Sequence, residues 1–562
     1  MANPNTLILK KIEERLRFIY QERYSNKLLT AFSELLSAYT PKNGSGIKWS
    51  ENDVVLITYG DSIKTDGEVP LQTLHSFLSQ QLKEQLTVVH ILPFFPYSSD
   101  DGFSVIDFRT VNPELGDWND IASLNRDFDW MGDLVINHVS SQSEWFKNFC
   151  KQEGKGKDFF ICEDPNTDLS QVTRPRNTPL LTPYQTEAGE KHVWTTFSAD
   201  QIDLNFANPE LLLEMMDILL GYIAKGARII RLDAIAFLWK KIGTTCLHLP
   251  ETHEVVKLMR DIAEYINPDI IILTETNVPN KENLSYFGNN DEAHMVYQFS
   301  LPPLLLHALH TGNSSYLRAW AQSLPQLDGN KTFFNFTASH DGIGVRPLEG
   351  LLPDNEKETL VANMQGFGGK VNYKSNPDGT TSPYELNITY FDALKGTAKG
   401  IDEFQVERFV ASQTVMMSLA GVPAFYIHSL TATPNYLEGV AQTGQNRTIN
   451  RRKWLLRELE EILAEDTPQR TVFETLKKLI SIRKKQAAFH PNGSQQILDL
   501  GSKLFGLIRE TETQSIAVIC NLTDTTQAFD PAVARGLAFD LISGQAFTSE
   551  TLHPYQCVWL TR

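Results

Sequence analysis

The sequence has few cysteines and no long apolar segment, and both absences narrow the kind of protein it encodes. Five cysteines are scattered through 562 residues and none forms a CxxC pair, so the sequence predicts neither a zinc site nor a disulfide framework. Reduced thiols of this kind are typical of the cytoplasm. No stretch is apolar enough to span a bilayer, and the first 18 residues form an amphipathic pattern without the apolar core of a secretory signal. We therefore expect a cytoplasmic protein.

Basic residues are also fewer than acidic ones. The chain has 51 Lys and Arg against 68 Asp and Glu, which gives a formal net charge of −17. An acidic surface repels nucleic acid and anionic membranes, so we expect neither as a partner, although a small anion can still find a local basic site. There is no internal repeat and no low-complexity segment. The hydrophobic content of 41% is ordinary for a globular protein, and the length allows more than one domain.

Eight short apolar runs recur along the chain, and helical patterns separate most of them. Alternation of this kind predicts an α/β protein with a (β/α)8 TIM barrel, because parallel strands joined by helices close into that fold. The expected barrel strands are residues 53–59, 87–93, 131–138, 227–234, 269–275, 295–301, 332–340 and 424–429. The expected helices include residues 71–84, 209–225, 254–266 and 403–420, and residues 8–38 also have a helical pattern.

Two intervals are too long for simple loops, and the pattern changes near the C-terminus. Insertions after the third and seventh strands are expected to shape an active site, because such loops lie at the catalytic face of a barrel. Short alternating runs after residue 486 predict an antiparallel β domain. We therefore divide the chain into an N-terminal helical extension (1–50), a barrel in three parts (51–138, 207–341 and 396–485), insertions at 139–206 and 342–395, and a C-terminal β domain (486–562).

Polar residues stand at the ends of four expected strands, where a buried core would not favour them. Arg231 and Asp233 are two residues apart, so on a strand they point to the same side. A structural ion pair is one interpretation. A catalytic carboxylate oriented by a neighbouring arginine is the other, and the C-terminal rim of a barrel strand favours it. The other three strand ends carry Asn137-His138, Glu275 and His340-Asp341.

Three of these residues, Asp233, Glu275 and Asp341, are carboxylates that should meet on one rim. No cluster of His and Cys accompanies them, so we expect no metal and no cofactor. Paired carboxylates flanking a scissile bond are the groups that cleave glycosidic bonds. One must be ionised, and the other must hold a proton near neutral pH, which requires an apolar or like-charged environment.

The four strand-end regions resemble, in type and order, the signature regions of the α-amylase superfamily. Within it, the sequence is most similar to the sucrose phosphorylase subfamily, through residues 94–107 (FFPYSSDDGFSVID), 243–246 (GTTC), 298–309 (QFSLPPLLLHAL) and 340–345 (HDGIGV). A finer resemblance links it to longer members, the glucosylglycerate and glucosylglycerol phosphorylases. They share the N-terminal extension and residues 172–183 and 382–394.

This resemblance implies a retaining α-glucoside phosphorylase that uses an α-glucoside and inorganic phosphate and releases α-D-glucose 1-phosphate. It implies that Asp233 is the nucleophile, Glu275 the general acid/base and Asp341 the stabiliser of the transition state. Phosphate or acceptor binding would fall to Arg176, Tyr384 and Glu385. The implied substrate-binding residues are Asp101, Phe103, His138, Phe197, Arg231, Phe237, Asn277, His340 and Arg451. Asn137 resembles a calcium ligand of some amylases, and we expect no metal there.

Departures from the subfamily pattern bear on the substrate. Some members carry Tyr at Phe237, and sucrose-specific members tend to have His at Asn277 and Gln at Glu385, so we expect glucosylglycerate or glucosylglycerol ahead of sucrose. The alternatives are sucrose phosphorylase proper, an α-glucosidase or transglucosidase using water or a sugar, and a catalytically inactive amylase-like protein, which the intact triad disfavours. Two of the implied site residues also have a purely structural interpretation. Arg451 could pair with a surface acid, and Arg176 could be a solvated loop charge. The oligomeric state stays open.

Overall fold

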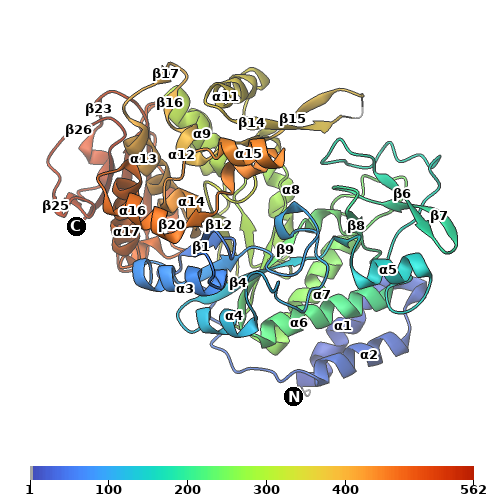
Figure 1. Ribbon diagram of the computed structural model, residues 1–562. Helices are drawn as coiled ribbons and strands as arrows, with labels where there is room; N and C mark the ends of the chain where they lie inside the picture. The colour runs from blue at the N-terminus through green and yellow to red at the C-terminus, as the bar shows by residue number, and fades with distance from the viewer. Residues whose placement is uncertain (1–3, 377) are drawn as a thin grey trace.

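A closed barrel of eight parallel strands forms the centre of the computed structural model, which describes residues 4–376 and 378–562 (Figure 1). The strands follow one another around the barrel in chain order, and the last pairs with the first. The predicted TIM barrel is therefore confirmed. Its strands are β1 (Val55–Thr58), β3 (Val88–Ile91), β4 (Asp129–Val135), β9 (Ala227–Asp233), β10 (Ile271–Thr274), β11 (Met295–Tyr297), β12 (Thr332–Asn335) and β18 (Val422–Tyr426).

Every residue of β1, β3 and β10 is buried, which explains why these strands read as continuous apolar runs. Several strands are shorter than the runs that predicted them. Glu275 lies just beyond β10, and His340 and Asp341 lie beyond the end of β12. These polar residues leave the sheet at the carboxyl end of the barrel, where their side chains are free to face a cavity.

Helices surround the barrel and bury one apolar face each against it. In α6 (Pro209–Ala224), Asn208 accepts a hydrogen bond from the N–H of Glu210, and Pro209 begins the helix, a combination that fixes where the helix starts. The other large helices of this layer are α3 (Pro70–Gln81), α7 (Pro250–Ile266), α9 (Leu301–Thr311), α13 (Gln405–Ser418) and α17 (Pro468–Arg483).

The N-terminal segment forms two helices, α1 (Pro4–Tyr20) and α2 (Asn26–Ser37), where the sequence pattern suggested one stretch. The break precedes Ser25, whose hydroxyl accepts a hydrogen bond from the N–H of Leu28 and caps α2. Helix α1 lies against α7, where Arg15 donates to Glu254 at 2.9 Å and to Asp261 at 3.1 Å. The extension is thus attached to the outside of the barrel (Figure 1).

Two long excursions of the chain carry β-hairpins on the same side of the barrel (Figure 1). The excursion after β4 contains β5 (His138–Ser140), α5 (Glu144–Lys151), the hairpin β6 (Leu181–Thr186) and β7 (Gly189–Trp194), and β8 (Gln201–Asp203). The excursion after β12 contains β13 (Ile343–Gly344), α11 (Asp354–Gly366), the hairpin β14 (Lys370–Ser375) and β15 (Thr381–Asn387), and α12 (Tyr390–Ala393). Both supply walls of the cavity described below.

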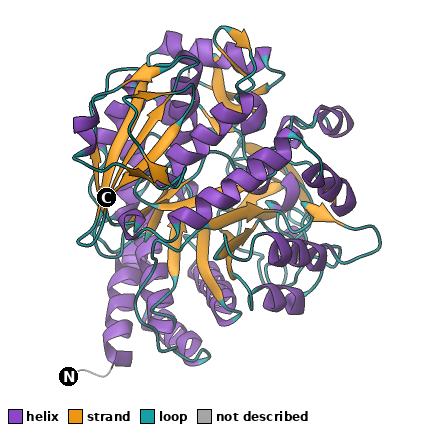
Figure 2. Ribbon diagram, turned by 90° about the vertical axis from the view of Figure 1, so that its left-hand side faces the viewer, coloured by secondary structure: helices purple, strands orange, loops and turns teal. Residues whose placement is uncertain are grey.

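The C-terminal part is an antiparallel sheet beside the barrel, as the sequence predicted (Figure 2). Trp559 and Arg509 attach it to α13, since their side chains donate to the hydroxyl and carbonyl of Ser418 at 2.9 and 3.0 Å. No helix in the described ranges is long and apolar enough to cross a membrane. The sheet runs in the order β20 (Ser494–Ile497), β21 (Leu504–Glu510), β22 (Ser515–Asn521), β27 (Cys557–Thr561), β24 (Phe539–Asp540) and β25 (Gln545–Ala546).

Candidate active site

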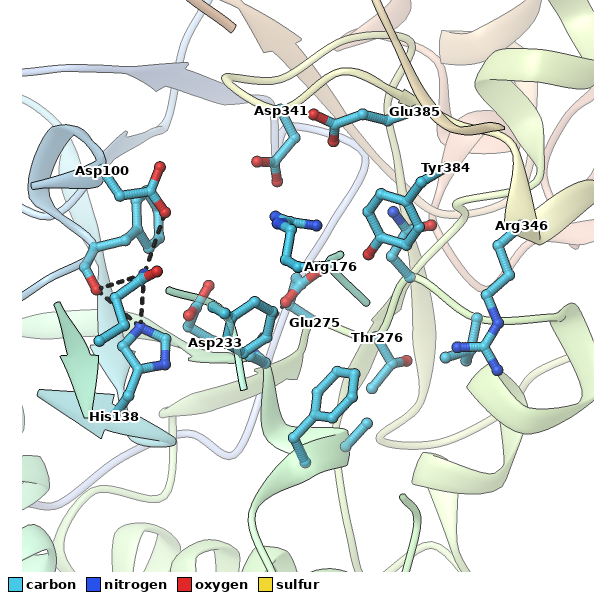
Figure 3. Close-up of a pocket in the computed structure, with 18 of the residues that line it drawn as sticks. Asp100, His138, Arg176, Asp233, Glu275, Thr276, Asp341, Arg346, Tyr384 and Glu385 are labelled. Carbon is cyan, nitrogen blue, oxygen red and sulfur yellow. Dashed lines mark hydrogen bonds between the residues drawn. The ribbon is translucent and has the colours of Figure 1, made fainter. Parts of the chain in front are cut away.

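A cavity opens at the carboxyl end of the barrel strands, and most of the predicted site residues line it (Figure 3). Its walls come from the ends of β9 and β10 and from both excursions. The predicted residues that line it are Phe103, His138, Arg176, Phe197, Asp233, Phe237, Glu275, Asn277, His340, Asp341, Tyr384 and Glu385.

Asp233 and Glu275 lie next to each other at the ends of neighbouring strands. Asp233 is the last residue of β9, and Ala234 then turns the chain with a φ of 50°, in the left-handed region that alanine rarely adopts. The N–H of Ala234 donates to Glu275 Oε2 at 2.9 Å. Arg231 donates to Asp233 Oδ1 at 2.7 Å and also pairs with the buried Asp133. The strained turn and the arginine together fix both carboxylates.

These two carboxylates share a buried site, which sets their protonation. Burial and the neighbouring Glu275 raise the pKa of Asp233, and burial and Asp341 raise the pKa of Glu275. Arg231 donates directly to Asp233 but stands 3.9 Å from Glu275. The Arg231 hydrogen bond favours the ionised form of Asp233, and the Ala234 N–H favours that of Glu275, while burial keeps the pKa of both carboxyl groups raised.

Asp341 has the opposite electrostatic environment. Burial alone would raise its pKa, but His340 and Arg447 hold the pKa of Asp341 well below its usual range. Arg447 Nη1 lies 2.9 Å from Asp341, and His340 Nε2 lies 3.6 Å away. Asp341 is therefore an anion facing the same cavity, able to stabilise positive charge that develops on a bound ring.

One side of the cavity combines neutral imidazoles with aromatic faces. His340 stacks on Phe103 with ring centroids 4.7 Å apart, and burial lowers the pKa of His340. Burial also lowers the pKa of His138, whose Nε2 lies 2.9 Å from the Phe103 carbonyl and 3.1 Å from Gln201 Nε2. Flat apolar faces edged by uncharged hydrogen-bonding groups suit a sugar ring, which has C–H faces and peripheral hydroxyls.

Asp101 and Arg451, both predicted to bind the sugar, are absent from the lining of this cavity. They bind each other at 2.6 Å and line a neighbouring cavity, and Arg451 Nε also donates to the carbonyl of His340 at 2.9 Å. Asp100 and Arg447 occupy the inward positions instead. Arg231, the third residue absent from the lining, lies behind Asp233 and acts through it.

A tight turn decides which aspartate faces inward. Asp100, Asp101 and Gly102 all have positive φ values, 53°, 47° and 109°. In this conformation Asp100 Oδ2 accepts a hydrogen bond from Gln201 Nε2 at 3.2 Å (Figure 3). Neither aspartate is distinguished in the sequence, because the choice depends on backbone angles that non-glycine residues seldom adopt.

The other side of the cavity carries Arg176, as predicted, with aromatic rings beside it. Its guanidinium lies 5.6 Å from the Phe197 ring centroid and 5.1 Å from that of Tyr384. Its Nη1 donates to the carbonyl of Pro175 at 3.2 Å, and it forms no ion pair among the residues that the structure describes. Arg174, by contrast, points to the carbonyl of Thr178 in its own loop.

Glu385 is a buried anion held by Arg447 and not by Arg176. It accepts hydrogen bonds from Arg447 Nε at 2.8 Å, Arg447 Nη2 at 2.9 Å and Asn372 Nδ2 at 2.9 Å. Burial would raise its pKa, but Arg447 lowers the pKa of Glu385. Arg447 also lies 2.9 Å from Asp341, so it joins Glu385 to the carboxylates of the cavity.

Five polar lining residues were missed from the sequence: Asp100, Gln201, Thr276, Arg346 and Arg447. Each lies close to a motif that was identified. Gln201 follows Phe197 by four residues, Arg447 precedes Arg451 by four, and Arg346 directly follows residues 340–345. Proximity to these motifs was the available signal, but it does not say which neighbour points into the cavity.

Asn137, the residue resembling a calcium ligand, binds a lysine. Lys240 Nζ donates to Asn137 Oδ1 at 2.6 Å and lies 2.7 Å from Asp203 Oδ2, and the side chains of Lys240 and Asp203 are almost fully buried. The ammonium group supplies the positive charge that this buried aspartate requires. Within residues 4–376 and 378–562, no group of three or more His, Cys, Asp or Glu side chains is arranged to hold a metal ion.

Comparison with known proteins gives first a class and then a family. Residues 80–341 match the alpha amylase catalytic domain. The chain is 46% identical to a glucosylglycerate phosphorylase from Allomeiothermus silvanus, over 100% of both chains, and 47% identical to one from Escherichia coli K12, over 91% of this chain and 92% of the relative. A solved sucrose 6F-phosphate phosphorylase from Thermoanaerobacter thermosaccharolyticum has a TM-score of 0.74 at 28% identity, covering 84% and 94% of the two chains. The chain belongs to the glucosylglycerate and sucrose phosphorylase family of the α-amylase superfamily.

Proposed function

We propose that this protein is a retaining phosphorylase that transfers glucose from glucosylglycerate to inorganic phosphate and releases α-D-glucose 1-phosphate. The observation that carries the proposal is the arrangement of Asp233 and Glu275, joined through the Ala234 N–H and distinguished by Arg231. The two relatives at 46% and 47% identity are both named glucosylglycerate phosphorylases, which favours glycerate over fructose as the leaving group.

In the first step, Asp233 attacks C1 of the glucosyl group while Glu275 protonates the departing oxygen. The negative charge that Arg231 stabilises on Asp233 and the proton on Glu275 are the states these roles need. Asp341, kept ionised by His340 and Arg447, stabilises the positive charge that develops on the ring. The product of this step is a β-glucosyl-enzyme.

In the second step, a phosphate oxygen attacks C1 from the side that the leaving group has vacated, and the bond between C1 and Asp233 breaks. Inversion at each step restores the α configuration, and it requires carboxyl groups about 5–5.5 Å apart. Phosphate must approach several buried acids, so the approach is repulsive unless a cation offsets it. We propose Arg176 for this role, because its planar fork matches phosphate oxygens and its charge has no ion-pair partner among the described residues.

The proposal is tested by the products. The enzyme is incubated with glucosylglycerate, glucosylglycerol or sucrose, each with and without phosphate, and glucose 1-phosphate and free glucose are measured. We expect α-glucose 1-phosphate from glucosylglycerate at the highest kcat/KM. Free glucose as the main product in saturating phosphate would identify a hydrolase, and early β-glucose 1-phosphate by NMR would exclude double displacement. A much higher kcat/KM for sucrose would reverse the substrate assignment.

We further propose that the enzyme works in the cytoplasm on small molecules. The support is that its five cysteines are free thiols, although Cys520 and Cys557 stand opposite each other on neighbouring strands. Labelling the native protein with a thiol reagent, with and without prior reduction, tests this. A reduction-dependent gain in labelled cysteines would contradict the proposal.

A further inference from the structure

Arg346 is a cation of the cavity to which neither the motifs nor the proposed reaction assigns a task. It begins a short turn, Arg346–Leu348, directly after β13, and it lines the same cavity as the catalytic acids. In Figure 3 it stands across the cavity from Asp100 and His138, beyond Thr276. Asp100 and His138 belong to the sugar-binding side, so Arg346 faces the position of the leaving group.

The charge of Arg346 is only weakly compensated within the protein. The nearest carboxylate oxygen, Glu282 Oε2, lies 3.7 Å from Arg346 Nη2, beyond hydrogen-bonding distance. That oxygen is 2.9 Å from His248 Nε2, and the Glu282 side chain is 40% exposed to solvent. Arg447, in contrast, makes two hydrogen bonds with the buried Glu385. Arg346 can therefore offer most of its hydrogen-bonding capacity to a ligand.

A second unsatisfied group lies in the same wall. Asn277 Oδ1 is buried and has no hydrogen-bond partner in the described part of the chain, although the residue lines the cavity. A buried acceptor without a partner is costly, so a ligand donor at this position is favoured. Gly344 closes over Asn277, since a Cβ at position 344 would lie 2.6 Å from Asn277 Oδ1. Any side chain at position 344 would therefore press against the Asn277 amide.

We infer that Arg346 binds the carboxylate of a hydroxy acid leaving group, and that Asn277 accepts a hydrogen bond from a hydroxyl of the same molecule. This inference rests on the proposed function. A guanidinium binds a carboxylate through two parallel hydrogen bonds, which an uncharged alcohol such as glycerol cannot reproduce. The two anions that the reaction uses in turn then have separate cations, Arg346 for the carboxylate and Arg176 for phosphate. Arg346 is a specificity residue in this scheme and takes no part in bond cleavage.

The test compares Arg346→Gln and Arg346→Lys with the wild type in the synthetic direction, with α-glucose 1-phosphate as donor and either glycerate or glycerol as acceptor. For Arg346→Gln we expect the glycerate KM to rise about tenfold or more, as the loss of a charge-assisted pair implies. The glycerol kcat/KM and, measured separately in the phosphorolytic direction, the phosphate KM should stay within about twofold, as for variants away from an interaction. Lysine should restore part of the loss. Arg126→Gln, an exposed arginine preceding β4 at the opposite end of the barrel, is the matched control.

Direct binding separates this inference from the proposed function. Calorimetry with glycerate on the wild type and on both Arg346 variants measures carboxylate binding without turnover. Unchanged glycerate affinity in Arg346→Gln, or an equal loss for glycerate and glycerol, would overturn the inference even if the wild type phosphorolyses glucosylglycerate. A wild type that binds glycerate through Arg346 but yields no glucose 1-phosphate would overturn the proposed function alone. If Arg346→Gln does not fold, Arg346→Lys decides, because its glycerate KM must still rise selectively.

Discussion

The two sides of the cavity use their arginines in different ways. On the inner side, Arg231 pairs with Asp133 and Asp233, and Arg447 pairs with Asp341 and Glu385. On the outer side, Arg176 and Arg346 have no hydrogen-bonded carboxylate among the described residues. The inner arginines fix the position and ionisation of the catalytic acids. The outer ones keep their charge available for anions that enter and leave.

Burial separates Arg231 from the other arginines. Its side chain is 3% exposed, against 16% for Arg447 and 15% for Arg346. A fully buried cation requires a permanent partner, because desolvation without one is costly. A cation at a solvent-connected wall remains partly hydrated until a ligand replaces the water. The same residue type thus serves structure in one place and recognition in another, and the following changes test that difference.

The largest effect is expected from a change at Asp233, the carboxylate that Arg231 holds and that we propose as the nucleophile. Asp233→Asn removes the group that forms the glucosyl-enzyme, so turnover should fall to background with every acceptor. The asparagine nearly preserves the volume, and circular dichroism should show an intact fold. Mass spectrometry with a slow activated substrate should detect no covalent adduct. Turnover near the wild-type rate would mean that Asp233 is not the nucleophile.

Glu275→Gln should reduce kcat by about 10²–10⁴-fold on glucosides with poor leaving groups, the usual contribution of general acid–base catalysis. A glucoside with a good leaving group should recover the first step, because it needs no proton.

The pH profile gives a second readout for the same variant. Glu275 acts when protonated, and its pKa is raised, so the wild-type kcat/KM should fall as pH rises through that pKa. The alkaline limb should disappear in Glu275→Gln with the activated glucoside. An unchanged alkaline limb would assign the proton to another group.

Arg447→Gln should lower kcat/KM for all acceptors and also destabilise the fold. It leaves Glu385 and Asp341 buried without their shared cation, and breaking a buried pair costs about 3–5 kcal/mol. Arg447 holds the pKa of both acids low, so removing it should raise both pKa values. On acidification, the variant should therefore lose activity at a higher pH than the wild type does. Urea unfolding and pH profiles measure the two effects. If only the phosphate KM changed, Arg447 would bind phosphate and would not hold the buried acids, which would contradict this prediction.

Arg176→Ala should have the smallest and most selective effect. Phosphate KM should rise about tenfold, the expected loss from one charge-assisted pair, and the fraction of free glucose should increase. Formation of the glucosyl-enzyme should change less, because that step uses no phosphate. Stability should change little, because Arg176 has no ion-pair partner among the described residues. If phosphate KM and the product ratio stay at wild-type values, Arg176 is not the phosphate-binding residue.

The sequence predicted the barrel strands well because strands buried on both faces consist of continuous apolar runs. It also placed Asp233 and Glu275 correctly at strand ends, since a charged residue ending an apolar run is conspicuous. Loop residues were harder. Asp100 and Asp101 are adjacent, of one type and both at positive φ. Arg447 and Arg451 lie in and directly after one short turn, so neighbouring candidates of the same type could not be told apart.

The chain by itself thus determined the fold and the carboxylates that meet at the strand ends, because hydrophobic periodicity and strand-end polarity are local properties of the sequence. Tertiary structure alone decided how each charge is used. Arg447 reaches Glu385 and Asp341 only because the excursion after β12 folds over the barrel mouth. Arg346 makes no hydrogen bond to Glu282 because the two side chains stay 3.7 Å apart. Whether an arginine is compensated depends on distances between residues far apart in sequence, and no local pattern encodes those distances.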